Sequence, residues 1–370
     1  MSRAHLLAMP TPHGFGHVAQ LAPVLEALHR RRPGLRLTVR ATVPEEKLRS
    51  LIGAPFEYLP EAVDFGMAMA SAVEVRPEAS LARYAGLHRD FGARVAAEAE
   101  RLRALGPDLI VANMPYLTLA AAAEAGVPAV GLGSLTWPEV FAAYCGHLPG
   151  AGPILAEMRR AQARATLTLR IEPGMPMAGL GRVVDVGPVA RRGRRRRGEL
   201  ERRVGCRPGE RLVLVSLGGI ETPLPVAAWP VTPGLRWLVP ASWRIDRTDF
   251  AAFDALGLPY HDVLASVDAA VCKMGYGMFV EAGCLGLPVV YRARGDWPEE
   301  PHLVPWLRRH GRCAAVDQAA LEAGAFVDLL RDLWARPAPP PVDPHGVEEA
   351  AELLLGYLPD GETRVARPCG

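Results

Sequence analysis

An alternation of short apolar runs with longer amphipathic segments constrains the fold of this chain more than any other feature of its sequence. In the first part of the chain, this pattern predicts strands at residues 4–9, 35–41, 56–59, 108–112 and 129–132, and helices at 18–31, 44–51, 81–105 and 116–125. Parallel strands need a crossover between them, which is usually a helix. The order of segments therefore predicts an α/β fold with a parallel sheet.

The alternation resumes after an arginine-rich stretch, with strands predicted at 212–217, 235–239, 269–272 and 289–291 and helices at 276–285 and 300–309. A length of 370 residues suits two domains of about 150 residues each. We predict two doubly wound, Rossmann-like domains, at residues 1–187 and 209–345, joined by a basic linker at 188–208. Residues 346–370 are expected to form a C-terminal helix and tail that packs back on the first domain. Paired domains of this class bind ligands in a cleft at the carboxyl ends of their strands.

Charge and cysteine content exclude several classes of protein. The 42 basic and 40 acidic residues leave a net charge of +2, so no nucleic-acid partner is expected. The arginine run at 191–197 is interpreted as a solvated linker, with binding to RNA or to an anionic lipid surface left open. Six cysteines without a C-x-x-C pair favour a reducing, cytoplasmic setting over a disulfide framework or a zinc site.

No apolar run approaches 18 residues, so no membrane span is predicted, while peripheral contact with a membrane stays open. Only Lys47 and Lys273 are lysines, and the other 42 − 2 = 40 basic residues are arginines. A lysine in this background needs an explanation.

The first informative motif is His13-Gly14-Phe15-Gly16-His17, between the first predicted strand and the first predicted helix. Glycine lets a backbone approach a ligand closely, and the start of a helix favours an anion. Neither G-x-G-x-x-G nor G-x-x-x-x-G-K-[ST] occurs, which argues against dinucleotide-dependent hydride transfer and P-loop phosphoryl transfer. Histidine is suited to proton transfer near neutral pH, so His17 and His13 are candidate bases, although an ordinary glycine turn remains an alternative.

The second motif runs from Lys273 to Glu281 and includes Gly275, Tyr276 and Gly277. A buried strand is expected to deliver the lysine and a glycine turn to the start of a helix, where amides can hold a diphosphate. Glu281 is suited to bind a ribose diol, with a structural role at the helix start as the alternative.

A polar loop at 292–300 follows the next predicted strand, and Gly218-Gly219 ends the strand at 212–217, where an ordinary tight turn is equally consistent. Trp137 is assigned either to the core or to the acceptor side.

Together these motifs resemble the two-domain GT-B glycosyltransferases, including the bacterial N-acetylglucosaminyltransferases that form lipid II. More closely, the string from Cys272 to Gly277 with Glu281-Ala282, the segment from Arg294 to Pro301 and the His13–His17 loop resemble the glycosyltransferase-like region that precedes the kinase domain of plant arabinokinases. The resemblance extends from about residue 4 to residue 311, and the kinase domain has no counterpart.

The resemblance implies that the first domain binds the acceptor and the second binds the nucleotide sugar. It implies that His17 deprotonates the acceptor hydroxyl, with His13 as the substitute. The residues expected to bind the donor are Gly14, Gly16, Gly218, Gly219, Lys273, Gly275, Tyr276, Gly277, Glu281, Arg294, Asp296, Glu299 and Glu300. Members of the family commonly have an acidic residue and a glutamine where this chain has Glu299 and Glu300, so the donor sugar stays open between hexosyl and N-acetylhexosaminyl types.

We therefore expect a glycosyltransferase that moves a sugar from a nucleoside-diphosphate sugar, with UDP as the expected nucleotide, to a small-molecule, lipid-linked or protein acceptor. No D-x-D motif occurs, which favours metal-independent transfer without a cofactor, and His17 as base favours inversion. A nucleotide-sugar hydrolase or epimerase and a non-catalytic sugar-nucleotide-binding protein remain alternatives.

Overall fold

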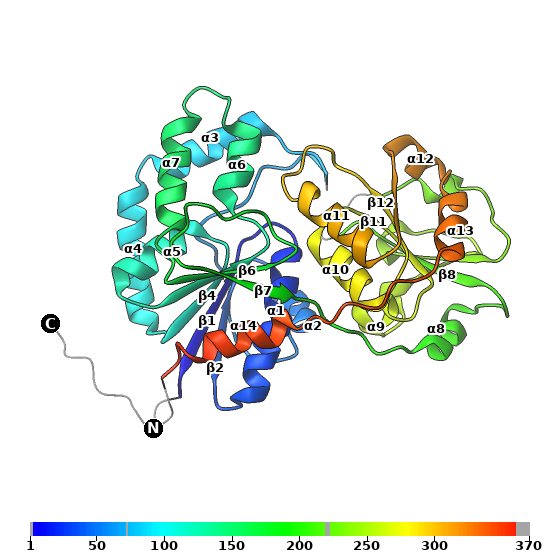
Figure 1. Cartoon of the computed structure of the whole chain (residues 1–370), viewed down its shortest axis with the longest axis horizontal. Coiled ribbons are helices and arrows are strands. Elements are labelled where there is room, and N and C mark those ends of the chain that lie inside the picture. Colours follow the sequence, from blue (N-terminus) through cyan, green and yellow to red (C-terminus); the bar gives the residue numbers. More distant parts are fainter. Residues whose placement is uncertain (1–2, 72, 219–222, 360–370) are drawn as a thin grey trace. The chain divides into compact units, whose positions relative to one another are not determined.

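The computed structural model describes residues 3–71, 73–218 and 223–359 and divides into two compact units. Unit 1 comprises Met1–Ala68, Val75–Val189 and His345–Gly370, and unit 2 comprises Met69–Glu74 and Ala190–Pro344. Each unit contains one parallel sheet with flanking helices (Figure 1), so the predicted fold class is confirmed.

The sheet of unit 1 has seven parallel strands in the order β3-β2-β1-β4-β5-β6-β7. Their bounds are His5–Pro10 (β1), Arg36–Arg40 (β2), Glu57–Leu59 (β3), Leu109–Asn113 (β4), Ala129–Gly133 (β5), Leu167–Glu172 (β6) and Val183–Pro188 (β7). Strands β1, β4 and β5 are buried along their whole length, as expected for parallel strands covered on both faces. Strands β6 and β7 were not predicted from the sequence.

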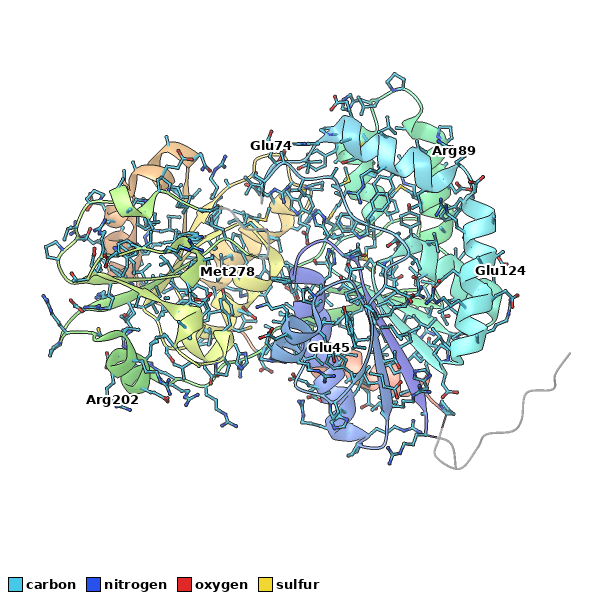
Figure 2. The ribbon with its side chains drawn as sticks, turned by 180° about the vertical axis from the view of Figure 1, so that it is seen from behind. Glu45, Glu74, Arg89, Glu124, Arg202 and Met278 are labelled. Carbon is cyan, nitrogen blue, oxygen red and sulfur yellow. The ribbon has the colours of Figure 1, made fainter. Side chains whose placement is uncertain are left out.

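The helices of unit 1 are Gly16–Arg31 (α1), Glu45–Leu51 (α2), Pro77–His88 (α3), Phe91–Leu105 (α4), Tyr116–Ala125 (α5), Trp137–Cys145 (α6), Ala151–Gln162 (α7) and Gly346–Leu355 (α14). The single helix predicted at 81–105 is wrong, because α3 ends at His88 and α4 begins at Phe91. Asp90 leaves the helical conformation, with φ −126° and ψ 37°, and Figure 2 labels Arg89 at this break.

Helix α14 packs on α1 and β7 and thereby returns the chain to unit 1, as predicted (Figure 1). Ala350, Ala351 and Leu354 are buried in this contact. At its edge, Arg30 pairs with Glu348 at 2.8 Å.

The sheet of unit 2 has six parallel strands in the order β10-β9-β8-β11-β12-β13. The strands are Arg211–Ser216 (β8), Leu235–Val239 (β9), Phe250–Ala252 (β10), Ala269–Lys273 (β11), Val289–Arg292 (β12) and Cys313–Val316 (β13). The helices are Arg197–Val204 (α8), Tyr260–Leu264 (α9), Tyr276–Leu285 (α10), Glu300–His310 (α11), Gln318–Ala323 (α12) and Val327–Ala335 (α13). Trp229 and Trp237 meet edge to face in its core, with ring centroids 5.0 Å apart.

The prediction of a basic linker at 188–208 is wrong, because unit 2 begins at Ala190 and α8 lies within this segment. The Arg194 backbone N–H donates to Asp262 at 2.8 Å, and the Arg197 guanidinium pairs with Asp268 at 2.6 Å. These acidic partners lie more than 60 residues further along the chain, so the arginine run alone could not indicate them.

The strand order reverses between β1 and β4 in unit 1 and between β8 and β11 in unit 2. In doubly wound sheets, ligands bind at the carboxyl ends of the strands at this reversal. The loops after these four strands therefore mark the expected ligand position of each unit. No helix among the described residues is long and apolar enough to cross a membrane.

Candidate functional site

The predicted glycine and histidine loop connects β1 with α1 in unit 1. Gly14 has φ +73°, which glycine adopts without steric cost. A Cβ atom at Gly14 or at Gly16 would meet no atom within 4 Å. The backbone of this loop therefore has room for close contact with a ligand.

His17 lies in the first turn of α1 and is only 6% exposed. Its Nδ1 hydrogen-bonds to Oδ1 of Asn113, the last residue of β4. Asn113 Nδ2 donates to Gln20 Oε1 at 2.8 Å, so Asn113 Oδ1 is the acceptor and His17 Nδ1 carries the proton. The lone pair of the neutral imidazole is therefore on Nε2. Burial lowers the pKa of His17 to about 4, and the bond to Asn113 opposes this only in part.

A relay of side-chain amides fixes this tautomer. Gln20 Nε2 donates to Ser134 Oγ at 2.9 Å, which orients the Gln20 oxygen toward Asn113. Sequence reasoning missed both amides. Asn113 is the only asparagine of the chain and Gln20 is one of three glutamines, so the rarity argument that singled out Lys273 also applies to them.

Trp137 contacts both histidines, with its ring centroid 4.9 Å from that of His13 and 5.4 Å from that of His17. It is fully buried and donates from Nε1 to Thr11 Oγ1 at 3.0 Å, so its place in the core is clear. A Cβ at Gly66 would lie 2.5 Å from both His13 Nδ1 and the Trp137 ring, so this position requires glycine. We call His13, His17, Gln20, Asn113 and Trp137 the histidine cluster.

Asp64, two residues before Gly66, is a buried carboxyl that the sequence did not single out. It accepts the Leu117 N–H, in the first turn of α5, at 3.4 Å, while its Oδ1 has no hydrogen-bond partner in the described part of the chain. Burial raises the pKa of Asp64 to about 7.

In unit 2, Lys273 ends β11 beside the loop that follows β8. A Cβ at Gly218 would lie 3.0 Å from Lys273 Cε, and one at Gly275 would lie 3.8 Å from its Nζ. The half-buried ammonium thus lies against two glycines predicted to bind the donor, and no carboxylate in the described ranges pairs with it. Burial, together with the positive charge of Arg294, lowers the pKa of Lys273 to about 8, so it is still mainly charged at pH 7. Gly219 lies outside the described residues.

Helix α10 begins at Tyr276, directly after Gly275, and has no acidic residue in its first turn. A Cβ at Gly277 would meet no atom within 4 Å, whereas Tyr276 is buried in unit 2. The first amides of a helix attract anions. The Lys273 ammonium and the start of α10 therefore provide positive charge on neighbouring residues of one turn.

Glu281 lies in the second turn of α10 and is half-buried. Burial raises the pKa of Glu281 to about 7, and Arg191 partly opposes this. The hydroxyl of Tyr260 hydrogen-bonds with Ser216 at the end of β8. Burial is the main cause that raises the pKa of Tyr260, and the nearby charge of Glu281 raises it further. We call Gly218, Lys273, Gly275, Gly277 and Glu281 the lysine cluster.

The carboxylates predicted to bind sugar hydroxyls hydrogen-bond within their own loop. Glu300 Oε2 accepts the backbone N–H groups of Arg294 and Gly295 at 3.0 and 2.8 Å. Glu299 is buried and its Oε2 accepts from Trp297 Nε1 at 2.8 Å.

Arg294 lies over the Trp297 ring, 3.9 Å from its centroid, and Asp296 is exposed. Arg294 and Asp296 lie in the predicted loop, which follows β12. Among the described residues, no group of three or more histidine, cysteine, aspartate or glutamate side chains is arranged to hold a metal ion.

Comparison with known proteins supports the fold. No protein-family model matches the chain. A curated relative, the L-arabinokinase of Arabidopsis thaliana, is 25% identical over 319 residues, which are 79% of this chain and 28% of that protein. The chain thus spans about a quarter of the length of this relative.

Solved structures match both units. The glycosyltransferase of kitacinnamycin has a TM-score of 0.66 at 17% identity, covering 97% of this chain and all of that one. The calicheamicin glycosyltransferase CalG4 has a TM-score of 0.60 at 20% identity, covering 96% and 95%. VinC, solved with dTDP, has a TM-score of 0.57 at 18% identity, covering 95% and 94%. The chain has the two-domain α/β layout of the GT-B glycosyltransferases.

Proposed function

We propose that this chain is a glycosyltransferase that moves a sugar from a nucleoside-diphosphate sugar to a hydroxyl acceptor. The observation that carries the proposal is the state of His17, a neutral imidazole whose Nδ1 is held by Asn113 so that Nε2 is the basic atom. The fold supports the same class of reaction, because its structural neighbours include glycosyltransferases solved with dTDP and with UDP. UDP is our proposed nucleotide.

In the proposed reaction, His17 Nε2 accepts the proton of the acceptor hydroxyl while the acceptor oxygen forms a bond to the anomeric carbon. The bond from that carbon to the diphosphate oxygen breaks, and the diphosphate leaves with the electron pair. A base on the face opposite to the leaving group gives inversion.

Lys273 and the first amides of α10 are the groups proposed to stabilise the leaving diphosphate, so this mechanism needs no metal ion. Glu281 is proposed to bind the ribose hydroxyls. The proposed acceptor base lies in unit 1, and the proposed donor-binding groups lie in unit 2.

The first test is thermal unfolding of the full chain with a panel of nucleotides and nucleotide sugars. A ligand at 100 times its dissociation constant stabilises the protein by about 2.7 kcal/mol. We expect uridine diphosphate and one or more UDP-sugars to raise the melting temperature. If no nucleotide does so, the proposal fails.

With a donor identified, His17→Ala is expected to lower turnover by roughly 10²- to 10⁴-fold, because the acceptor loses its base, while donor affinity stays the same. His147→Ala, an exposed histidine of unit 1, is the matched control. Normal turnover in the His17 variant would exclude His17 as the base and leave His13 as the candidate.

One observation favours the non-catalytic alternative, a sugar-nucleotide-binding protein. The partner of His17 is an amide, which does not stabilise an imidazolium by charge. Donor binding without turnover toward any hydroxyl acceptor would support that alternative. Release of free sugar without an acceptor would instead indicate a hydrolase.

A further inference from the structure

The amino ends of the strands in unit 2 carry two neighbouring hollows that the proposed reaction does not use. One has a volume of about 630 Å³ and the other about 250 Å³, and Arg312 lines both. Gly286–Pro288 precede β12, and Gly311 and Arg312 precede β13. The lysine cluster is at the opposite ends of the strands, and β12 alone, four residues long, separates the two edges by roughly 13 Å.

Arginines make up four of the nine residues that line the larger hollow and three of the twelve that line the smaller one, with Arg312 common to both. Six of them share this position: Arg195, Arg211, Arg308, Arg309, Arg312 and Arg336. In the larger hollow, the other lining residues are glycine, cysteine, alanine and proline, so no carboxylate is present.

Arg312 is the fixed member of this group. Its guanidinium donates to the backbone oxygens of Leu333 and Arg336 at 3.2 Å and of Gly286 at 3.0 Å. Its Nε has no hydrogen-bond partner in the described part of the chain. Burial and the charge of Arg211 lower the pKa of Arg312, as expected for a cation beside another cation. Backbone carbonyls thus hold the side chain in place without neutralising its charge.

Arg211 is also held in a defined position. Its guanidinium lies 4.3 Å from the centroid of the Trp334 ring, and Trp334 Nε1 donates to the Asp268 backbone oxygen at 2.9 Å. Asp268 lines the smaller hollow, but its carboxylate already pairs with Arg197 at 2.6 Å and accepts the Leu212 N–H at 2.6 Å.

Three arginines at the start of α8 and within it show the opposite pattern. Arg196 and Arg203 both pair with Glu199, and Arg197 pairs with Glu201 and Asp268. Around the two hollows, no described carboxylate pairs with any of the six arginines. The unbalanced positive charge is therefore concentrated at one concave place.

We propose that the larger hollow binds a small soluble molecule that carries two phosphoryl groups, with Arg309, Arg312 and Arg336 as its principal ligands. Guanidinium groups match phosphate oxygens in bidentate geometry and stay charged at any physiological pH. The volume of the larger hollow, about 630 Å³, suits a small ligand. This site is independent of the proposed transferase reaction.

The test is calorimetric titration of the full chain with inorganic pyrophosphate. The double variant R309Q and R336Q removes two of the three proposed ligands and is expected to weaken binding by roughly tenfold or more. Both side chains are exposed, and Arg312 stays in place, so the fold is expected to be kept. The matched control is the double variant R202Q and R331Q, which removes two exposed arginines that line neither hollow (Figure 2 labels Arg202 on α8). The control is expected to bind within about twofold of the parent.

Pyrophosphate could also bind at the lysine cluster, so each titration is repeated in the Lys273→Met background, where the arginine site is expected to be unchanged. Absence of binding at about 1 mM, equal weakening in the control, or complete loss in Lys273→Met would each overturn the proposal. A parallel arm uses phosphatidylcholine vesicles with and without phosphatidic acid. Binding to the phosphatidic acid vesicles without binding to soluble pyrophosphate would overturn it in favour of a membrane surface.

Discussion

Asparagine and aspartate have nearly the same volume but differ by one charge. A substitution between them at position 113 therefore changes the electrostatics at His17 while keeping its geometry. Asn113→Asp is expected to raise the pKa of His17 by one unit or more, because a carboxylate stabilises the imidazolium that the amide does not. Proton NMR of the His17 ring during a pH titration measures this shift.

The control for this substitution is Gln318→Glu, which exchanges an amide for a carboxylate in unit 2. It is expected to leave His17 unchanged. A His17 pKa that stays near 4 in Asn113→Asp would contradict the assigned relay.

The two lysines provide a matched pair of substitutions. Lys273→Met is expected to weaken UDP binding by about 10- to 100-fold, because a hydrogen bond to a charged group contributes roughly 1.5–3 kcal/mol. Lys47→Met, which changes the only other lysine, is expected to keep UDP affinity, since Lys47 lies in unit 1 over the Phe15 ring. Calorimetry measures the affinity of both variants for UDP. Equal affinities would show that Lys273 does not bind the diphosphate.

Site residues that lie within a sequence motif were predicted, whereas residues that the fold places beside a motif from elsewhere in the chain were not. His17 and Lys273 were identified because each lies in a glycine-containing loop after an apolar run. Asn113 was missed because its partner is 96 positions away in the chain. The roles of Glu299 and Glu300 came from resemblance, which did not reveal that both hydrogen-bond within their own loop.

Helix α14 offers a comparison between apolar burial and surface charge. Leu354 is fully buried, so Leu354→Ala is expected to lower the free energy of unfolding by about 2–5 kcal/mol. Glu348→Gln removes the exposed ion pairs of Glu348 with Arg30 and Arg31 and is expected to cost less than about 1 kcal/mol. Urea unfolding of the two variants measures the difference, and similar losses would mean that the helix is not held by its apolar face.

Elements with a clear period were predictable, and elements defined by distant partners were not. The strands β1, β4, β8 and β11 appear as apolar runs in the sequence, and their helices follow at the expected spacing. The break between α3 and α4 was missed because a charged, alanine-rich segment has the same composition whether its helix is continuous or interrupted. Helix α8 was missed because the arginine run that leads into it was interpreted as a solvated linker.

The free energy of unfolding is expected to depend on pH through Asp64. Its pKa is about 7 in the folded chain and is ordinarily 3.8, so the folded state binds this proton more tightly. The resulting stabilisation is present below pH 3.8 and is lost as the pH rises through 7, with an upper limit of roughly 4 kcal/mol.

Asp64→Asn is expected to remove this dependence, so that urea unfolding at pH 5 and at pH 8 differs less than in the parent. Asp332→Asn, at an exposed position of unit 2, is the control. A parent whose stability is equal at both pH values would contradict the assignment.

At the scale of the molecule, the alternation of strands and helices predicted two domains but not which segments compose them. Residues 69–74 belong to unit 2, although they lie within the sequence of unit 1. The nearly balanced net charge gave no indication of a local excess of positive charge. Arginines that are far apart in the sequence line the same two hollows.

The return of α14 to unit 1 has a consequence for synthesis on the ribosome. Unit 2 interrupts unit 1 between residues 190 and 344, so the strands of unit 1 emerge well before the helix that completes their packing. At about 5–20 residues per second, these roughly 150 residues take on the order of 10–30 seconds to translate. During that interval the surfaces of α1 and β7 on which α14 later packs are exposed in the nascent chain, and unit 2 can fold before unit 1 is complete.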